Sequence, residues 1–226
     1  FGFHGLSHAW IARRAPEVLG REARELRIVS AHLGAGASLC AIADGRSIDT
    51  TMGFTPLAGL VMATRSGDVD PGLIAWLAGH ERVAADRLGE ALERESGLQG
   101  LCGSADMRAV LARAAAGEDS ARLALDVYVH RLRAGIAAMA AALGGLDALV
   151  FTGGVGERSP EIRSLTASRL GFLGIAVDEE RNRHAGGEGE IGAPAARAHT
   201  LVLASREDLE IAGQVRTLLA GAPRSA

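Results

Sequence analysis

The chain has 226 residues, of which 48% are apolar and 23% charged, the balance of a soluble globular protein. Its formal net charge of -3 argues against a surface built to bind nucleic acid or anionic membranes. Apolar runs fall short of the ~20 residues of a membrane span and two cysteines make no disulfide framework, so we expect no membrane partner and a cytoplasmic protein.

The first fifty residues predict one helix followed by three short strands. The helix covers 7–19, and the strands cover 26–33, 37–43 and 46–51. Asp44-Gly45 is a two-residue hairpin turn between the last two strands. Because the strands are joined by tight turns, we expect an antiparallel meander.

The middle of the chain predicts four helices. They cover 70–78, 83–95, 106–116 and 120–143, and Asp70-Pro71 is a typical start for the first. The longest carries an apolar stripe with spacings of 4 and 3, which predicts a face directed to the core. This stripe consists of Leu125, Val129, Leu132, Ile136, Met139 and Leu143.

The last third alternates strands and helices. Strands are predicted over 148–152 and 201–204, with a short one at 175–177, and helices over 159–170 and 207–219. Residues 185–198 read as a surface loop. Together with the meander, this pattern predicts an α/β domain with a mixed sheet.

Two glycine-rich segments are candidates for phosphate or nucleotide contact. HLGAGAS (32–38) lies between two strands, where such a segment taken alone is usually a plain turn. FTGGVGERS (151–159) connects a buried strand through glycines to a helix that starts at Ser159. This arrangement lets the backbone approach an anion, although it could also be only a tight connection.

Several other side chains can be interpreted from their surroundings in the sequence. Arg65 lies in a glycine-flanked loop and could neutralise a phosphoryl group or form an ion pair with Asp68. His4, ahead of the first helix, is free to donate to a ligand, whereas His8 is expected on the helix surface. Ser205 and Asp208 match a capping box, and the cysteines, Cys40 and Cys102, read as core residues.

The combination of motifs is more specific than any single one. FHGLSH, HLGAGAS, MGFTPLAGLVMATRSGDVDPG, SADMRAV, VFTGGVGERSPEIR and SREDLEIA occur in this order. Order and spacing resemble the acetate kinase family from Phe1 to about Leu219. This resemblance implies a ribonuclease-H-like mixed sheet (βββαβαβα) with helical insertions, as in the superfamily of acetate and sugar kinases, chaperone ATPases and actin.

The resemblance also implies a reaction, reversible phosphoryl transfer between ATP and acetate that gives acetyl phosphate and ADP, and roles for individual residues. Arg65 and His4 correspond to the residues that stabilise the transition state, and Glu207 to the carboxylate that binds Mg²⁺ or Mn²⁺. Three segments correspond to the nucleotide site: His32, Leu33, Gly34, Ala35 and Gly36; Asp106, Met107 and Arg108; Gly154, Val155, Gly156, Glu157 and Arg158.

Some positions depart from the family pattern. Leu6 stands where threonine is usual, Ala35 and Arg158 where asparagine is usual, and Ser205-Arg206 where Thr-Asn is usual. Ala35 removes an amide from the phosphate loop, so an inactive nucleotide-binding module is an alternative to an enzyme. Propionate or butyrate kinase is another.

The chain begins at Phe1 without an initiator methionine, which predicts a fragment or a processed product. Members of the resembled family have two domains, and the motifs here belong to the second. We therefore expect residues 1–204 to be the C-terminal nucleotide-binding domain and residues 205–226 to be a closing helix and tail that pack toward the first domain. The isolated chain is expected to be inactive, and the full-length protein to be a homodimer.

Overall fold

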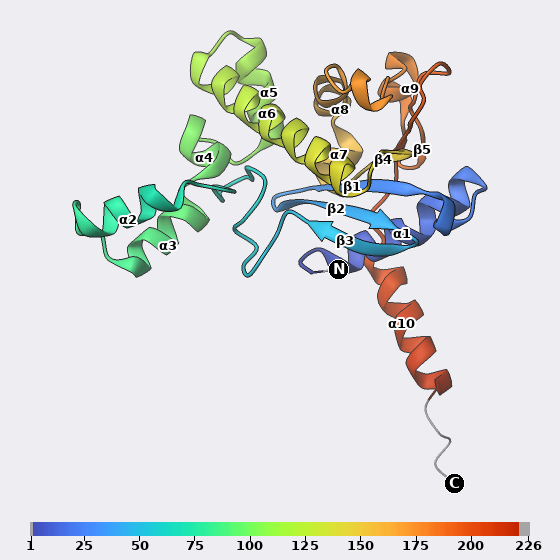
Figure 1. The fold of residues 1–226 in the computed structure, drawn as a ribbon. Helices are drawn as coiled ribbons and strands as arrows, with labels where there is room; N and C mark the ends of the chain where they lie inside the picture. Colours follow the sequence, from blue (N-terminus) through green and yellow to red (C-terminus); the bar gives the residue numbers. More distant parts are fainter. Residues whose placement is uncertain (1, 222–226) are drawn as a thin grey trace.

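The computed structural model describes residues 2–221, and Phe1 and the tail 222–226 lie outside this range. One six-stranded sheet runs through the molecule in the order β3-β2-β1-β4-β6-β5 (Figure 1). Its strands are β1 (Arg27–Leu33), β2 (Ala37–Ala43), β3 (Arg46–Thr50), β4 (Ala148–Thr152), β5 (Gly189–Glu190) and β6 (His199–Val202).

The predicted meander is confirmed. Strand β2 pairs antiparallel with both β1 and β3, while β1, β4 and β6 run parallel. Because the side chains of a strand alternate between the two faces, β1 and β4 contribute to two cores. One face carries Val29, Ala31 and Phe151, and the opposite face carries Ile28 and Val150.

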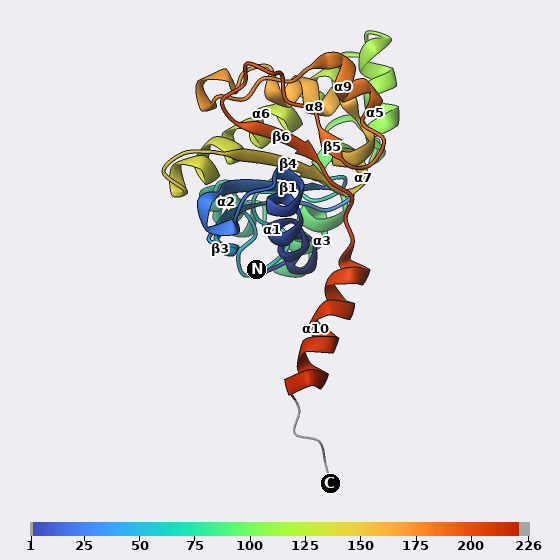
Figure 2. The same cartoon turned by 90° about the vertical axis from the view of Figure 1, so that its right-hand side faces the viewer.

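Helices cover both faces of the sheet (Figure 2). Helix α6 (Asp119–Ala142) packs on one face, and the middle of its predicted stripe is buried, from Val129 to Met139. Helix α1 (Gly5–Leu19) packs on the other face through Ile11 and Ala15. The remaining helices on the α6 side include α5 (Met107–Ala115), α7 (Gly153–Arg158), α8 (Pro160–Ala167) and α9 (Glu179–His184).

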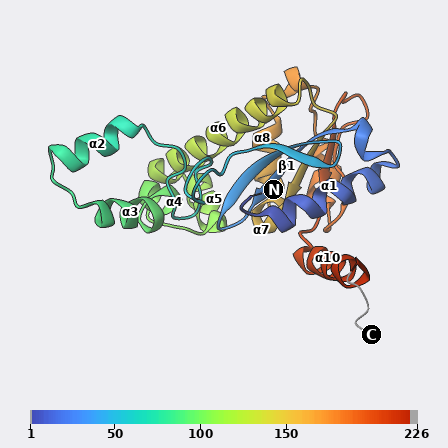
Figure 3. The same ribbon diagram turned by 60° about the horizontal axis from the view of Figure 1, so that its bottom comes forward.

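Two parts of the chain project from this body (Figure 3). One is a pair of helices, α2 (Pro71–Gly79) and α3 (Ala85–Arg94), and the other is α10 (Glu207–Gly221). Asp70 caps α2 as predicted by accepting from the Gly72 amide at 2.8 Å. Among residues 2–221, every helix is too short or too polar to cross a membrane.

Several local predictions were wrong. The glycine connection that was expected ahead of the helix at Ser159 is itself helical, as α7, and α4 (Gly97–Cys102) and α9 were not predicted. Only Val177 of the expected strand 175–177 forms a bridge, and 185–198 contains β5 and the buried Ile191.

The expected capping box at the start of α10 is replaced by other contacts. The hydroxyl of Ser205 donates to Ser7, and Asp208 forms an ion pair with Arg206. The segment before α10 is therefore joined to α1 on the body of the protein.

Candidate functional site

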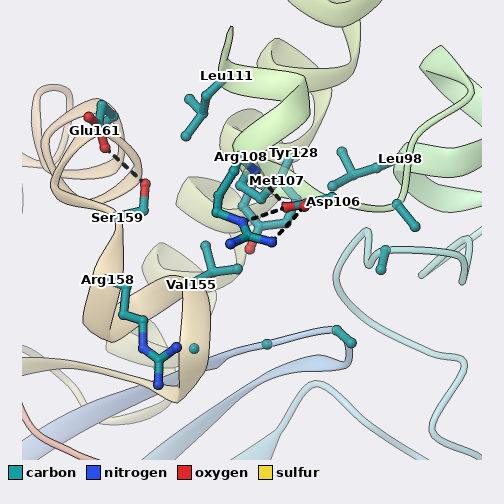
Figure 4. A pocket seen from close by; sticks show the side chains of 15 residues that line it. Leu98, Asp106, Met107, Arg108, Leu111, Tyr128, Val155, Arg158, Ser159 and Glu161 are labelled. Atoms are coloured by element: carbon teal, nitrogen blue, oxygen red, sulfur yellow. Dashed lines mark hydrogen bonds and ion pairs between the residues drawn. The ribbon is translucent and has the colours of Figure 1, made fainter.

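A cavity of about 810 Å³ opens between α5, α7 and the turn that joins β1 to β2 (Figure 4). Its walls are largely apolar, with Met107, Leu111 and Val155 among them. Its polar groups come from Asp106, Arg108, Arg158, Ser159 and Glu161. A cavity of this size with apolar walls and few polar groups is typical of a small-molecule site.

The three segments predicted to contact a nucleotide meet at this cavity. Eight of the thirteen predicted residues line it: Gly34, Ala35, Asp106, Met107, Arg108, Gly154, Val155 and Arg158. They come from three separate parts of the chain, and the fold alone brings them together. Ala63, Leu98, Ala105 and Tyr128 complete the lining with residues that the sequence did not single out.

Asp106 and Arg108 form a fixed pair at the start of α5. The carboxylate of Asp106 accepts from the Arg108 amide at 2.9 Å and caps the helix. It also accepts from the guanidinium, with Nη2 at 2.9 Å, which lowers the pKa of Asp106 below its usual value. Arg108 is otherwise exposed, so it remains available to a ligand at the rim.

The other five predicted residues lie outside the lining. Leu33 and Gly156 are buried, His32 is half-buried in β1, and Gly36 is half-buried in the turn before β2. The carboxylate of Glu157 accepts from two backbone amides, that of Gly153 at 3.0 Å and that of Ser205 at 2.9 Å. Glu157 therefore joins α7 to the segment that precedes α10.

Gly36 marks the point where the two predicted catalytic side chains converge. A Cβ atom built on Gly36 would lie 3.1 Å from His4 Nε2 and 3.3 Å from Arg65 Nη1. Any side chain here would occupy the space that both groups face. Because Gly34 and Ala35 line the neighbouring cavity, the turn leads from that cavity to His4 and Arg65.

The ion pair between Arg65 and Asp68, one of the two interpretations of Arg65, is wrong. Within residues 2–221, Asp68 instead accepts from the Gly59 amide at 2.7 Å and pairs with Arg131 at 3.3 Å. Arg65 donates from Nη1 to the carbonyl of Pro56 at 3.4 Å. Since no carboxylate neutralises it among the described residues, its charge is available to an anion near Gly36.

The expectation that His8 lies on the helix surface is also wrong. His8 is 1% exposed, and it packs between α1 and the sheet with hydrogen bonds to Ser30 and Ser38. His4 and His32 are stacked beside it, with ring centroids 4.3 Å apart. Two serines on the adjacent strands supply the polar partners that a helix-based prediction could not foresee.

All three histidines are kept neutral near pH 7. Burial, helped by the neighbouring histidines, lowers the pKa of His8 to about 3 and that of His32 to about 4. Burial and the charge of Arg65 lower the pKa of His4. Each ring therefore offers one N–H donor and one lone pair.

We expect this cluster to make the protein sensitive to mild acid. The unfolded chain protonates His8 near pH 6.5, whereas the native state resists protonation down to about pH 3. Stability is thus lost as the pH falls below 6.5, at about 1.4 kcal/mol per pH unit for a residue such as His8. Urea unfolding at pH values between 7 and 5 gives the free energy of unfolding at each pH. We expect this free energy to fall less steeply with decreasing pH in His8→Asn than in the wild type. An equal pH dependence of the unfolding free energy in both proteins would contradict a buried, neutral His8.

Glu207 lies in a separate hollow that it shares with His4. This hollow is also lined by Gly2, Leu6 and Gln214. Residues 2–221 contain no group of three acidic, histidine or cysteine side chains arranged around a metal. Glu207 is thus a single candidate ligand, which suits Mg²⁺ because that ion is held by one or two carboxylates together with substrate phosphates.

Two buried polar residues near the cavity were missed from the sequence. Arg163 is 1% exposed and donates to the carbonyls of Gly156 and Glu157 at 2.8 and 2.9 Å, which holds the end of α7. Tyr128 lines the cavity with a buried hydroxyl that has no partner among residues 2–221. Its spacing of four from Leu132 and eight from Ile136 was a signal that it shares their buried face.

Comparisons with known proteins agree with this geometry. A family model described as the acetokinase family matches residues 1–213. An acetate kinase of Trichormus variabilis is 49% identical over 220 residues, which make up 97% of this chain and 54% of that protein. The chain spans about half the length of the curated relatives it matches.

Solved structures give the same result. The crystal structure of Porphyromonas gingivalis acetate kinase is similar with a TM-score of 0.92 and 39% identity, covering 96% of this chain and 55% of that one. A propionate kinase from Francisella tularensis is similar with a TM-score of 0.86 and 39% identity, covering 92% and 53%. The predicted α/β fold with a mixed sheet is confirmed, and the chain belongs to the acetokinase family.

Proposed function

We propose that this chain is the nucleotide-binding part of a kinase that transfers a phosphoryl group reversibly between ATP and acetate. One observation carries the proposal: a cavity lined by Gly34, Met107 and Val155 opens beside the point where His4 and Arg65 converge. A nucleotide with its base in the apolar part of the cavity would extend its phosphates along the turn at Gly34–Gly36.

The proposed reaction beside Gly36 requires groups that stabilise the negative charge of the transferred phosphoryl group. Phosphoryl transfer is catalysed mainly by positioning and by donors aimed at the oxygens of the transferred group. Arg65 contributes a permanent charge, and His4 contributes a neutral N–H donor that faces the same space beside Gly36. The acceptor carboxylate attacks the phosphorus in line with the departing ADP.

Glu207 is the residue we assign to Mg²⁺ (or Mn²⁺). Its carboxylate shares a hollow with His4, which supports a position close to the reacting phosphates. When bound, the ion would neutralise charge on the phosphate oxygens. Glu207 is held at the start of α10, and α10 is anchored to α1 by the ion pair between Arg13 and the buried Glu210.

Two alternatives remain within the proposal. The similarity to a propionate kinase keeps propionate and butyrate as possible acceptors. An inactive module is the other, because Ala35 supplies no side-chain donor. Product formation by the full-length protein with acetate, propionate and butyrate, trapped as hydroxamates, distinguishes them. Binding of ATP without any product would support the inactive module.

We further propose that residues 205–226 pack toward the remaining part of the full-length protein. We also propose that the full-length protein is a cytoplasmic homodimer. Leu209, Val215 and Leu219 of α10 are 39%, 47% and 72% exposed, and a single apolar surface of this kind favours a covering partner.

We expect residues 1–226 alone to bind magnesium–ATP weakly and to form no acetyl phosphate. The chain spans about half the length of the curated relatives it matches, so we expect the groups that enclose the acceptor and exclude water to come from the remaining part of the full-length protein. The test is to trap acetyl phosphate with hydroxylamine in parallel reactions of the isolated chain and of the full-length protein. Sustained turnover by the isolated chain, free of longer protein, would contradict this expectation.

A further inference from the structure

A continuous line of hydrogen bonds leads from the buried sheet to His4. Ser30 Oγ of β1 lies 2.9 Å from His8 Nδ1, and His8 Nε2 lies 2.8 Å from Ser38 Oγ of β2. Ser38 Oγ lies 2.9 Å from His4 Nδ1. Ser30, His8 and Ser38 are at most 1% exposed, so water cannot replace a missing partner.

The line can carry its hydrogens in two directions, because Ser38 either donates to one of its two histidines or leaves its own hydrogen buried without a partner. In the first, Ser30 donates to His8, His8 donates to Ser38, and Ser38 donates to His4 Nδ1. In the second, each of these bonds is reversed, and His4 donates from Nδ1. Neutral imidazoles have one donor and one acceptor nitrogen, so one choice fixes all three bonds.

Ser30 decides between the two directions. Within residues 2–221, the hydroxyl of Ser30 has His8 Nδ1 as its one hydrogen-bond partner. In the second direction this hydroxyl becomes an acceptor, and its own hydrogen is left buried without a partner. A buried donor without a partner is unfavourable by about 1–3 kcal/mol, so the first direction prevails.

We propose that His8 and Ser38 are positioning residues that hold His4 as the tautomer with its hydrogen on Nε2. Nε2 is the His4 nitrogen that faces the space beside Gly36, where Arg65 Nη1 also lies. This line of hydrogen bonds would thus make Nε2 of the neutral His4 a donor that is directed at the same point as the Arg65 guanidinium. Two converging donors suit an anionic oxygen of the transferred phosphoryl group.

The ring of His4 is also held in place. It stacks on His32, whose Nδ1 is bonded to the Ser7 hydroxyl at 2.8 Å. His4 itself has a φ of 54°, a backbone conformation that non-glycine residues seldom adopt, at the residue that precedes α1. Both the orientation of the ring and its tautomer are therefore set before a ligand arrives.

The tautomer can be measured directly, whatever the catalytic activity. Histidine ¹⁵N spectra of the full-length protein near pH 7 distinguish a protonated nitrogen from an unprotonated one. We expect His4 to be protonated at Nε2 in the wild type and in Ser38→Thr, and to lose this preference in Ser38→Ala. Thr200→Val removes a different buried hydroxyl of the sheet and should leave the His4 signals unchanged. A wild-type His4 protonated at Nδ1 would overturn the proposal even if Ser38→Ala does not fold.

The kinetic consequence rests on the proposed function. We expect Ser38→Ala to lower kcat by about 10- to 100-fold while the KM for ATP changes less than about threefold, because only a transition-state donor is misplaced. Ser38→Thr should keep most of kcat. An equal loss in both variants, or a loss confined to KM, would contradict a positioning role. A wild type without kinase activity would refute the proposed function and leave the spectroscopic test intact.

Discussion

Replacing Arg65 with alanine in the full-length protein should reduce turnover by ~10³-fold or more, with little change in nucleotide affinity. Arg65 lies beside Gly36 and makes no ion pair within the part of the chain that the structure describes. Removing this charge therefore breaks no ion pair among the described residues. It also lies outside the lining of the nucleotide cavity, so its loss should affect the transition state more than binding.

Arg131→Ala is the matched control for this experiment. Arg131 is also near the loop of Arg65, but its guanidinium pairs with Asp68 on the surface, where both side chains are well exposed. Such pairs contribute little to stability, so turnover should stay close to wild type. Near-normal turnover in Arg65→Ala, or an equal loss in both variants, would remove Arg65 from the catalytic assignment.

Introducing valine at Gly154 should strongly weaken ATP binding while the protein remains folded. Gly154 is exposed on α7 and lines the cavity, and a Cβ atom built there meets no atom within 4 Å. The Cβ atom of the new side chain thus meets no neighbour in the free protein, and the side chain extends into space that we assign to the nucleotide. Calorimetric titration with ATP measures the loss, and a thermal melt reports whether the fold is kept.

Gly89→Val separates this effect from the general unfavourable effect of valine in a helix. Gly89 lies on the exposed surface of α3, and a Cβ atom there also meets nothing within 4 Å. Both variants carry the same change in helix propensity. If ATP binds equally well to both, Gly154 does not face the nucleotide.

The elements that follow clear periodic patterns were predictable from the sequence. Strand 37–43 and strand 148–152 agree with the structure residue for residue, and the long helix is shifted by one residue at each end. Their apolar residues repeat at the spacing of the structure they form. Asp70 and Asp106 also cap their helices as short polar residues do.

Features that depend on distant contacts were not predictable in this way. Residues 153–158 contain three glycines, which disfavour a helix, yet α7 forms because Arg163 holds its last carbonyls. His8 was placed on the surface as a polar residue, although its spacing of three, four and seven from Ile11, Ala12 and Ala15 matches the buried face of α1, where Ser30 and Ser38 supply its partners. Glu157 follows the glycine motif in sequence but bonds to the backbone of Ser205, 48 residues away.

The site was predictable to the extent that its residues come from local motifs. Each segment of the cavity was visible as a glycine turn or a helix start, but each alone was compatible with an ordinary connection. What could not be derived from spacing was their meeting around one cavity and the convergence of His4 with Arg65. These are properties of the β1–β4 pairing and of the packing of α1 and α5 on the body.

A crystal structure of the full-length protein with ADP and Mg²⁺ tests the central claim most directly. We expect the adenosine between Met107 and Val155, the phosphates along Gly34–Gly36, and the terminal phosphate directed toward His4 Nε2 and Arg65. A nucleotide bound elsewhere, or in this cavity with its phosphates directed away from Gly36, would contradict the proposed site.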